Sequence, residues 1–334
     1  MTRPNEFKAL VITESEDHQF LRSVAKKTIE DLPEGDVIVQ VKYSSLNYKD
    51  VLSATGNRGV TRNYPHTPGI DAAGIVAESA DNNFKPGDEV IVTSYDLGMN
   101  TAGGFGQYIR VPAGWVVPLP AGLTLREAMV YGTAGFTAAL SVYQMIDSGI
   151  APEDGTILVS GATGGVGSIA VSILSKSGYT VAAVNGIVDE AAYLKQLGAG
   201  EVISIEEATD TSGRPMLKSR WAGGIDTVGG DILATTIKSV APNGAVTCCG
   251  NVASPDLPLN VFPFILRGAR LIGIDSQNCP MPLRQKIWQK IASDWKIDWL
   301  ETLTTEAPFA DLDNRIEWML QGKHKGRTII RMAD

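Results

Sequence analysis

A glycine-rich turn joins two apolar segments in the middle of the chain. The run Ile157–Val159 is apolar and β-branched, and the turn after it contains Gly161, Gly164, Gly165 and Gly167. Glycines there let the backbone approach a pyrophosphate and let the following helix pack against the strand. The N–H groups at the start of that helix, expected near Gly167, would face the phosphates. The pattern predicts a nucleotide-binding turn, with an ordinary tight loop as the alternative.

A polar loop is expected after an earlier strand, over residues 44–50. It contains Asn47, Tyr48 and Asp50. Beside a reactive ring, the Tyr48 phenol can donate a hydrogen bond or a proton, Asn47 can orient a carbonyl or carboxamide, and Asp50 can cap a helix. These three are the candidate catalytic residues. A solvated surface loop would have the same composition.

The second strand of the predicted nucleotide-binding unit ends in Asn185, Gly186 and Ile187. At this tip an acidic residue usually holds the ribose 2′-hydroxyl of NAD, and a basic residue accommodates the 2′-phosphate of NADP. The tip has neither, and we interpret the nearby Asp189 as a helix cap. We favour NADPH as the cofactor and keep NADH, or use of both, open.

The residues that usually bind metals are scattered along the chain. His18, His66 and His324 lie far apart in sequence, and Cys248 and Cys249 are adjacent on an expected strand, where their side chains point to opposite faces. Catalytic zinc needs three converging ligands, so we expect no metal. The motifs of serine hydrolases and P-loop proteins, and the Tyr-Lys pair of short-chain dehydrogenases, are also missing from the sequence.

The composition is that of a globular protein with an acidic balance. Twenty-nine Lys and Arg residues face 37 Asp and Glu residues, for a formal charge of −8. This balance argues against binding to nucleic acid or to an anionic membrane surface. Three cysteines form no disulfide framework, and the first residues contain no apolar signal segment, so we expect a cytoplasmic protein. The uncharged stretches 128–146 and 155–175 are interrupted by Gly, Ser and Thr and are not expected to span a membrane.

The length of 334 residues suggests two domains. Short β signals separated by turns predict a barrel-like β domain up to about residue 125. Beyond it, strands and helices alternate, which predicts a doubly wound parallel sheet of six strands. The expected strands of this sheet are 156–160, 180–184, 201–205, 225–228, 245–250 and 271–275. The tail returns to a strand at 327–332, so we assign it to the first domain.

Several sequence blocks together resemble the medium-chain dehydrogenase/reductase superfamily, and more narrowly its zinc-independent quinone oxidoreductase branch in the acrylyl-coenzyme A reductase group. The resemblance covers essentially the whole chain. It implies a GroES-like catalytic domain formed by residues 1–125 and 277–334, a Rossmann NAD(P)-binding domain over residues 126–276, and commonly a homodimer. The blocks are Ser45–Asp50, Pro68–Gly74, Lys85–Val90, Gly132–Ala138, Gly161–Gly167, Pro263–Arg267 and Gly273–Ser276.

The same resemblance implies positions for individual residues. Tyr48 would lie against the nicotinamide and Thr133 near its carboxamide. The pyrophosphate would be bound by Thr163, Gly164, Gly165, Val166 and Gly167, and the adenosine ribose by Asn185, Gly186 and Ile187. The remaining cleft would be lined by Gly250, Ser276 and Arg327.

Ile70, Ile187 and one loop depart from the patterns of related proteins. Ile70 stands where zinc members carry a histidine, and Asp71 is expected to be a buried hydrogen-bonding support. Close relatives usually have a basic residue at Ile187, so NADPH preference is not simply inherited. The loop 94–100 lacks the tryptophan of many acrylyl-coenzyme A reductases.

The expected function is NAD(P)H-dependent hydride transfer, without metal, to the β-carbon of an α,β-unsaturated carbonyl or to a quinone. Tyr48 would then donate to the oxygen that becomes negative. Two alternatives stay open. One is a zinc-type alcohol or aldehyde dehydrogenase, and the other is a nucleotide-binding protein that serves as a redox sensor or structural protein without turnover.

Overall fold

The computed structural model describes residues 6–186 and 190–332. The chain forms two compact units. Unit 1 contains residues 1–133, 277–292 and 300–334, and unit 2 contains residues 134–276 and 293–299. The division thus falls within the segment after residue 125, and a short piece of the tail joins unit 2.

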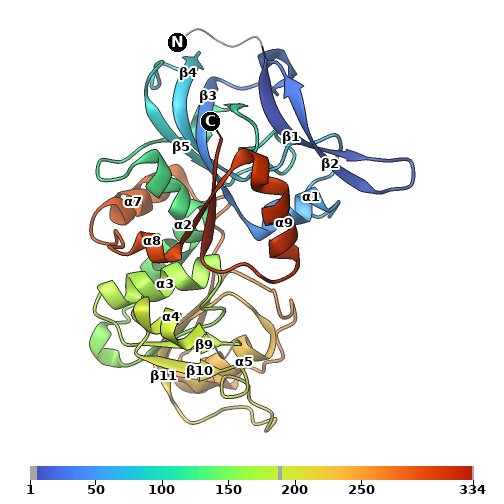
Figure 1. Cartoon of the computed structure of the whole chain (residues 1–334). Helices are drawn as coiled ribbons and strands as arrows, with labels where there is room; N and C mark the ends of the chain where they lie inside the picture. Colours follow the sequence, from blue (N-terminus) through green and yellow to red (C-terminus); the bar gives the residue numbers. More distant parts are fainter. Residues whose placement is uncertain (1–5, 187–189, 333–334) are drawn as a thin grey trace. The chain divides into compact units, whose positions relative to one another are not determined.

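Unit 1 is built on a seven-stranded mixed sheet (Figure 1). Its strand order is β14-β15-β3-β4-β5-β7, and β6 also pairs with β3. The last strand, β15, pairs antiparallel with β3, so segments from the first and last parts of the chain share one sheet. The strands are β3 (Val37–Leu46), β4 (Asp71–Ser79), β5 (Glu89–Thr93), β6 (Tyr108–Val111), β7 (Val116–Pro118), β14 (Thr304–Pro308) and β15 (Arg327–Arg331).

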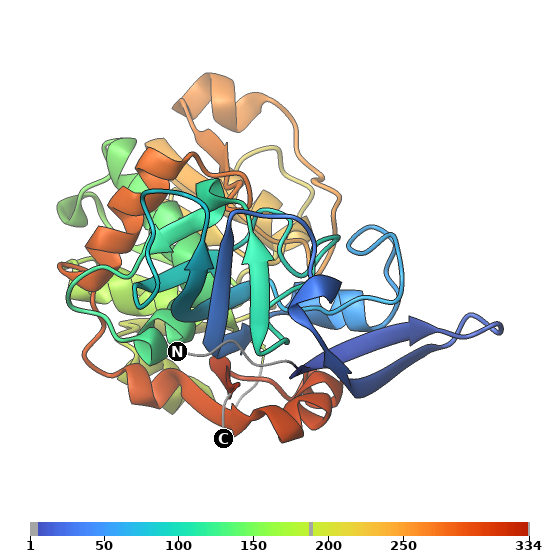
Figure 2. The same ribbon diagram turned by 90° about the horizontal axis from the view of Figure 1, so that it is seen from above.

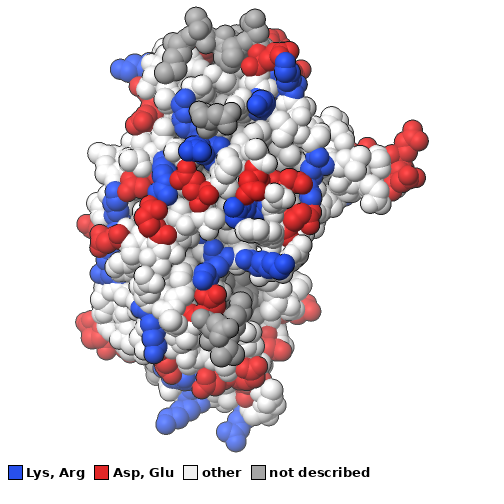
Figure 3. Space-filling view, in the orientation of Figure 1, with Lys and Arg blue, Asp and Glu red and all other residues white. Residues whose placement is uncertain are grey.

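A separate hairpin of β1 (Phe7–Glu14) and β2 (Phe20–Lys27) extends from the rest of unit 1 (Figure 2). The strand β2 was not expected, because its residues lack an apolar alternation and are largely exposed or half-buried. Acidic side chains gather at the tip of the hairpin, which includes Glu16 and Asp17 (Figure 3).

The core of unit 1 consists of aliphatic side chains from alternate positions of the strands. Val37, Val39 and Val41 of β3 are all buried in it. This alternation is what the sequence predicts for a strand with one core-facing side. The helices of this unit are α1 (Tyr48–Ala54), α7 (Met281–Ala292), α8 (Leu300–Leu303) and α9 (Leu312–Leu320).

The helix α2 (Leu125–Asp147) passes from unit 1 into unit 2. It is interrupted at Gly132, whose backbone is non-helical with φ of 50° and ψ of −155°. The division between the units follows directly after this kink.

Unit 2 contains a six-stranded parallel sheet with the order β10-β9-β8-β11-β12-β13. The direction of strand progression reverses between β8 and β11, as in a Rossmann sheet, which agrees with the predicted fold class. The strands are β8 (Ile157–Val159), β9 (Val181–Asn185), β10 (Glu201–Ser204), β11 (Trp221–Asp226), β12 (Val240–Cys248) and β13 (Arg270–Gly273).

Four helices of unit 2 connect or flank these strands. Their bounds are α3 (Gly165–Lys176), α4 (Ala191–Gln196), α5 (Gly230–Ser239) and α6 (Phe262–Arg267). The helix α3 is rich in apolar residues, and its residues from Gly167 to Leu174 are buried. None of the helices in the described ranges combines the length and apolar character that a membrane crossing requires.

Candidate functional site

The polar loop after β3 forms the N-terminus of α1. Asn47 is the residue before this helix, and its backbone N–H donates to the Asp50 carboxylate at 2.8 Å. Asp50 also accepts from the backbone N–H groups of Gly69 and Ile70. Tyr48, the first residue of the helix, leaves its side chain 54% exposed. Hydrogen bonds to Asp50 therefore hold the backbone of the loop in place, while the phenol of Tyr48 remains accessible.

Asp71, at the start of β4, is the centre of a buried hydrogen-bond network in unit 1. Its carboxylate accepts from the Ser45 hydroxyl at 2.5 Å, from the Asn47 amide at 2.8 Å and from the Thr133 hydroxyl at 2.6 Å. The backbone N–H of Thr133 donates to it as well. Three segments far apart in sequence are thereby joined. We call Ser45, Asn47, Asp50, Asp71, Thr133 and Arg327 the Asp71 cluster.

Arg327, at the start of β15, supplies the positive charge of the cluster. Its guanidinium donates to the Ser45 hydroxyl, the Asn47 side-chain oxygen and the carbonyl oxygen of Val130. It lies 3.9 Å from the Asp71 carboxylate. The side chain is only 2% exposed. This burial and these bonds suit a supporting residue, and the cleft-lining position that the resemblance implied stays a prediction.

Gly132 is required by the close packing of this network. A Cβ atom built there would lie 2.5 Å from an oxygen of Asp71, 2.6 Å from the Ser45 hydroxyl and 2.9 Å from the Arg327 guanidinium. Its positive φ adds a second reason for glycine. The sequence analysis did not single out this residue, because only the folded neighbours reveal the crowding.

The surroundings of Asp50 change the pKa of its carboxyl group. Burial, and then the nearby charge of Asp71, raise the pKa of Asp50 to about 7. Burial lowers the pKa of Arg327, against the opposing effects of Asp71 and Asp50. Near neutral pH, Asp50 thus has a proton that it can lose or gain.

Within the described ranges, no group of three or more His, Cys, Asp or Glu side chains converges to hold a metal ion. His66 is buried and bonded to the carbonyl oxygen of Gly98, and His324 bonds to that of Gly326. All three cysteines have free thiols.

The glycine-rich turn in unit 2 joins β8 to α3 as predicted, but the helix begins at Gly165, earlier than the expected start near Gly167. A Cβ atom at Gly167 would lie 2.3 Å from the carbonyl oxygen of Gly161, so glycine lets the helix contact the turn. Gly161 itself has φ of +57°. Thr163, Gly164 and Val166 lie in or beside the turn and are half-buried.

A buried carboxylate, Asp226 at the end of β11, supports the turn from the neighbouring strand. It accepts from the Ser160 hydroxyl at 2.8 Å and from the backbone N–H of Gly229 at 2.7 Å. The sequence analysis missed Asp226, although an acidic residue that ends an apolar strand before two glycines is a usable signal. Gly250 follows β12, and a Cβ atom there would meet the Thr227 carbonyl oxygen at 2.1 Å.

Two further predicted residues of unit 2 have different surroundings. The Ser276 hydroxyl accepts a hydrogen bond from Thr137 of α2 at 2.8 Å. Asn185 ends β9 and is 9% exposed. Ile187 lies outside the described residues.

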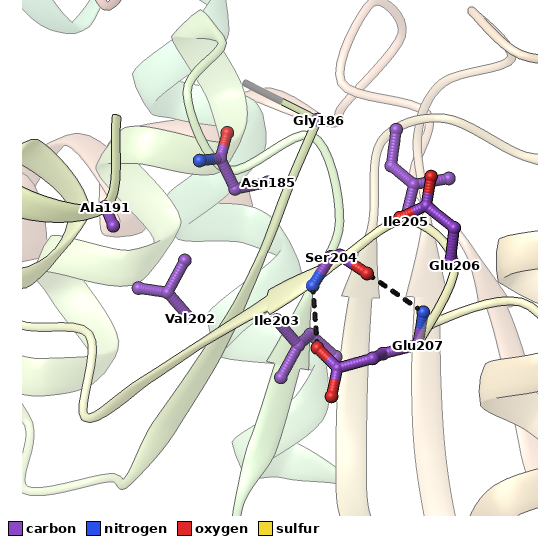
Figure 4. Close-up of a pocket in the computed structure, with 9 residues that line it drawn as sticks. All are labelled: Asn185, Gly186, Ala191, Val202, Ile203, Ser204, Ile205, Glu206 and Glu207. Carbon is purple, nitrogen blue, oxygen red and sulfur yellow. Dashed lines mark hydrogen bonds between the residues drawn. The ribbon is translucent and has the colours of Figure 1, made fainter. Parts of the chain in front are cut away.

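A pocket of about 370 Å³ lies at the carboxyl ends of β9 and β10 (Figure 4). It is lined by Asn185, Gly186, Ala191, Val202, Ile203, Ser204, Ile205, Glu206 and Glu207. In an open parallel sheet, ligands bind beyond the carboxyl ends of the strands, where the strand order reverses. The glycine-rich turn near Gly167 and Gly250, together with this pocket beyond the second strand, fits a dinucleotide.

Comparison with known protein families assigns a class to this arrangement. The family model of the alcohol dehydrogenase GroES-like domain matches residues 33–121, and that of the zinc-binding dehydrogenases matches residues 165–293. The first match lies in unit 1 and the second mostly in unit 2. The fold and the two matches define a two-domain dehydrogenase.

The relatives narrow this class. The chain is 48% identical over 313 residues to YhfP of Bacillus subtilis, provisionally named a quinone oxidoreductase, covering 93% of this chain and 95% of YhfP. It is 42% identical over 325 residues to the acrylyl-CoA reductase AcuI of Ruegeria pomeroyi, covering 97% and 98%. The chain therefore belongs to the medium-chain dehydrogenase/reductase superfamily, in its group of quinone oxidoreductases and acrylyl-CoA reductases.

Solved structures of such relatives share the fold. A Bacillus subtilis YhfP structure with NAD bound has a TM-score of 0.96 and 45% identity, covering 98% of this chain and all (100%) of that one. The yhdH oxidoreductase of Salmonella enterica in complex with NADP has a TM-score of 0.95 and 42% identity, with coverage of 98% and 100%.

Proposed function

We propose that the protein is an NAD(P)H-dependent reductase of an activated C=C bond, such as that of an enone or an acrylyl thioester, or of a quinone. The observation that carries this proposal is similarity over nearly the whole chain to relatives crystallised with NADP and NAD. Proteins of the same group are named as quinone oxidoreductase and acrylyl-CoA reductase.

The residues of the glycine-rich turn, 163–167, would hold the pyrophosphate, and those at the β9 tip, Asn185 to Ile187, the adenosine ribose. Gly250 and Ser276 would border the rest of the cofactor. When bound, a reduced nicotinamide supplies a hydride to the acceptor. The chain itself contributes position and polarity.

Tyr48 is the proposed hydrogen-bond donor to the acceptor carbonyl. Negative charge develops on that oxygen as the β-carbon is reduced, and a donor placed there stabilises the charge. The exposure of the Tyr48 side chain supports this role, because a ligand can reach the hydroxyl. Its position at the fixed start of α1 keeps the donor oriented.

The Asp71 cluster is proposed to position Tyr48 and Thr133. Asn47 and Asp50 hold the backbone on which Tyr48 stands, and Asp71 holds both hydrogen-bond donors of Thr133. Thr133 would in turn lie near the carboxamide of the cofactor. Arg327 balances the carboxylate charge and takes no direct part in the reaction.

The Tyr48→Phe variant tests the proposal. It should lower kcat with a conjugated enone by about 10²–10³-fold, the usual cost of losing one such donor, and leave the Kd of the cofactor unchanged. Tyr43→Phe is the matched control, because it removes the same hydroxyl from β3, and its activity should equal that of the native protein. A turnover in Tyr48→Phe equal to that of the control would remove Tyr48 from the mechanism.

We also propose a cytoplasmic homodimer. The free thiols suit a reducing compartment. For the dimer, the support is in unit 2, where β13 is an edge strand of the six-stranded sheet. Leu271 on β13 is 36% exposed, and Ile265 and Leu266 of the adjacent α6 are 70% and 64% exposed. Edge strands with apolar neighbours are suited to pairing between copies.

A further inference from the structure

We infer that the pocket at the tips of β9 and β10 selects a ribose with a free 2′-hydroxyl, so that the protein uses NADH in preference to NADPH. The inference rests on the proposed function, since it concerns the adenosine end of the same cofactor. It also departs from the preference for NADPH that the sequence analysis favoured. The residues that carry it are Ile205, Glu206 and Glu207.

The position of the pocket relates it to the cofactor. It opens at the carboxyl end of β9, the second strand of the dinucleotide-binding half, and is completed by β10 and the turn that follows (Figure 4). In sheets of this strand order the adenosine ribose lies at the end of the second strand. A group on the ribose 2′-oxygen would therefore meet the residues of this pocket.

Ile205 directly follows β10, and its side chain reaches toward the end of β9. It is 44% exposed, although it is a large aliphatic residue. It also approaches Gly186 closely, because a Cβ atom at Gly186 would lie 2.8 Å from the Ile205 Cδ1. The contact leaves an apolar surface, suited to an adenine or ribose face, where a basic side chain could bind a phosphate.

The charges in the pocket are negative. Among its nine described lining residues, Glu206 and Glu207 are the ionisable ones and none is Lys or Arg. The Glu207 carboxylate accepts from the backbone N–H of Ser204 at 3.0 Å, so it turns back onto the end of β10. Hydrogen bonds from its own backbone and from Ser204 lower the pKa of Glu206, which is exposed.

A 2′-phosphate is a poor ligand for such a pocket. It carries about −1.5 to −2 charges at neutral pH and needs cationic or N–H donors. Two carboxylates close by repel it, whereas a 2′-hydroxyl can donate a hydrogen bond to a carboxylate. The pocket thus accepts the ribose of NADH and disfavours that of NADPH.

The test is the binding of NADH, NADPH, AMP and 2′,5′-ADP to the native protein by calorimetry. The two nucleotides report on the adenosine end alone. We expect NADH to bind more tightly than NADPH by at least about tenfold, which is about 1.4 kcal/mol, and AMP to bind more tightly than 2′,5′-ADP. Equal or tighter binding of the 2′-phosphorylated members of both pairs would overturn the inference.

Variants assign the preference to the pocket. Ile205→Arg and Glu206→Gln should each tighten NADPH binding and so lower the ratio of the Kd for NADPH to the Kd for NADH. The change should be larger for the arginine variant. Glu201→Gln removes a carboxylate from the opposite end of the same strand and should leave the ratio unchanged. If neither pocket variant changes the ratio of the two Kd values, the preference does not come from this pocket.

These outcomes are separate from the fate of the proposed function. Tight NADH binding without reduction of any enone, thioester or quinone would uphold the inference and reject the reductase. Reduction with NADPH as the better cofactor would reject the inference and uphold the reductase. Failure of both cofactors to bind would reject both.

Discussion

At the residue scale, the site of unit 1 depends on a few charges in an apolar setting. Two carboxylates and one guanidinium are buried together, and they form hydrogen bonds both within the Asp71 cluster and to the backbone around it. Removing one partner of such a network leaves another polar group buried without its hydrogen bonds. The free-energy cost of that loss is larger than the net contribution of the intact network to stability. The cluster therefore fixes geometry, and geometry is what a donor such as Tyr48 needs.

The sequence predicted part of this cluster. Asn47, Tyr48 and Asp50 share one loop, and the resemblance implied Asp71 as a support. The bond between Asp71 and the segment containing Thr133, and the burial of Arg327, could not be predicted from the residues. Arg327 reaches the cluster because β15 pairs with β3, and Thr133 reaches it directly after the non-helical residue Gly132 of α2. Local sequence patterns do not record such contacts between distant segments.

Gly132→Ala should destabilise the protein by about 1–3 kcal/mol. The new Cβ would require a strained backbone and would clash with Asp71, Ser45 and Arg327. Urea unfolding measures the change. Gly114→Ala is the control, because no heavy atom lies within 4 Å of its Cβ position, and it should shift stability by less than about 0.5 kcal/mol. Equal effects of the two substitutions would mean that the packing at Gly132 is not tight.

Asp50 predicts a pH dependence of stability. Its folded pKa, about 7, lies above the ordinary value. The folded chain therefore holds the proton more strongly than the unfolded chain, and the stabilisation from this group, full below about pH 4, is lost as the pH rises through about 7.

Asp50→Asn should remove this dependence. In urea unfolding, the native protein should lose stability relative to Asp50→Asn between about pH 5 and pH 8. Asp31→Asn provides the comparison, since the pKa of this exposed carboxyl is lowered by its bond to the backbone of Thr28, so it titrates below that window. A constant difference between the native protein and Asp50→Asn would show that Asp50 does not titrate there.

At the element scale, the six strands of the parallel sheet were predicted because short β-rich segments alternate with glycine turns and helices. The central strands β8, β9 and β11 are continuous buried runs. All six expected ranges overlap strands of the sheet in unit 2. The strands β2 and β14 were missed, because both have polar, largely exposed residues and are defined by their pairing partners.

The edge strand β13 and the helix α6 predict self-association. Introducing a charge with Ile265→Glu should convert the proposed dimer to monomers, since a buried carboxylate at an apolar interface is strongly unfavourable. Light scattering coupled to gel filtration measures the mass. Leu21→Glu, at an exposed aliphatic residue of the β1–β2 hairpin in unit 1, is the control and should remain dimeric. A native protein that elutes as a monomer would reject the dimer itself.

At the scale of the whole molecule, each of the two units contains a different part of the candidate site. Unit 1 builds the buried Asp71 cluster from the N-terminal part and the tail of the chain, and unit 2 builds the glycine-rich turn and the pocket from the middle. The change from short strands separated by turns to alternating strands and helices led us to expect a first division near residue 125, whereas the two units divide after Thr133. Which unit a short segment such as 293–299 belongs to depends on tertiary packing, so its place in unit 2 could not be predicted from the sequence.

The central claim is that hydride is added to the β-carbon of a conjugated carbonyl compound. The most direct measurement uses NADH and NADPH deuterated at C4, with a simple enone and with acrylyl-coenzyme A, and locates the label in the product by NMR and mass spectrometry. We predict a saturated product with deuterium at the β-carbon. Deuterium at the carbonyl carbon, in an alcohol product, or no cofactor oxidation with any of these acceptors or with a quinone, would contradict the account.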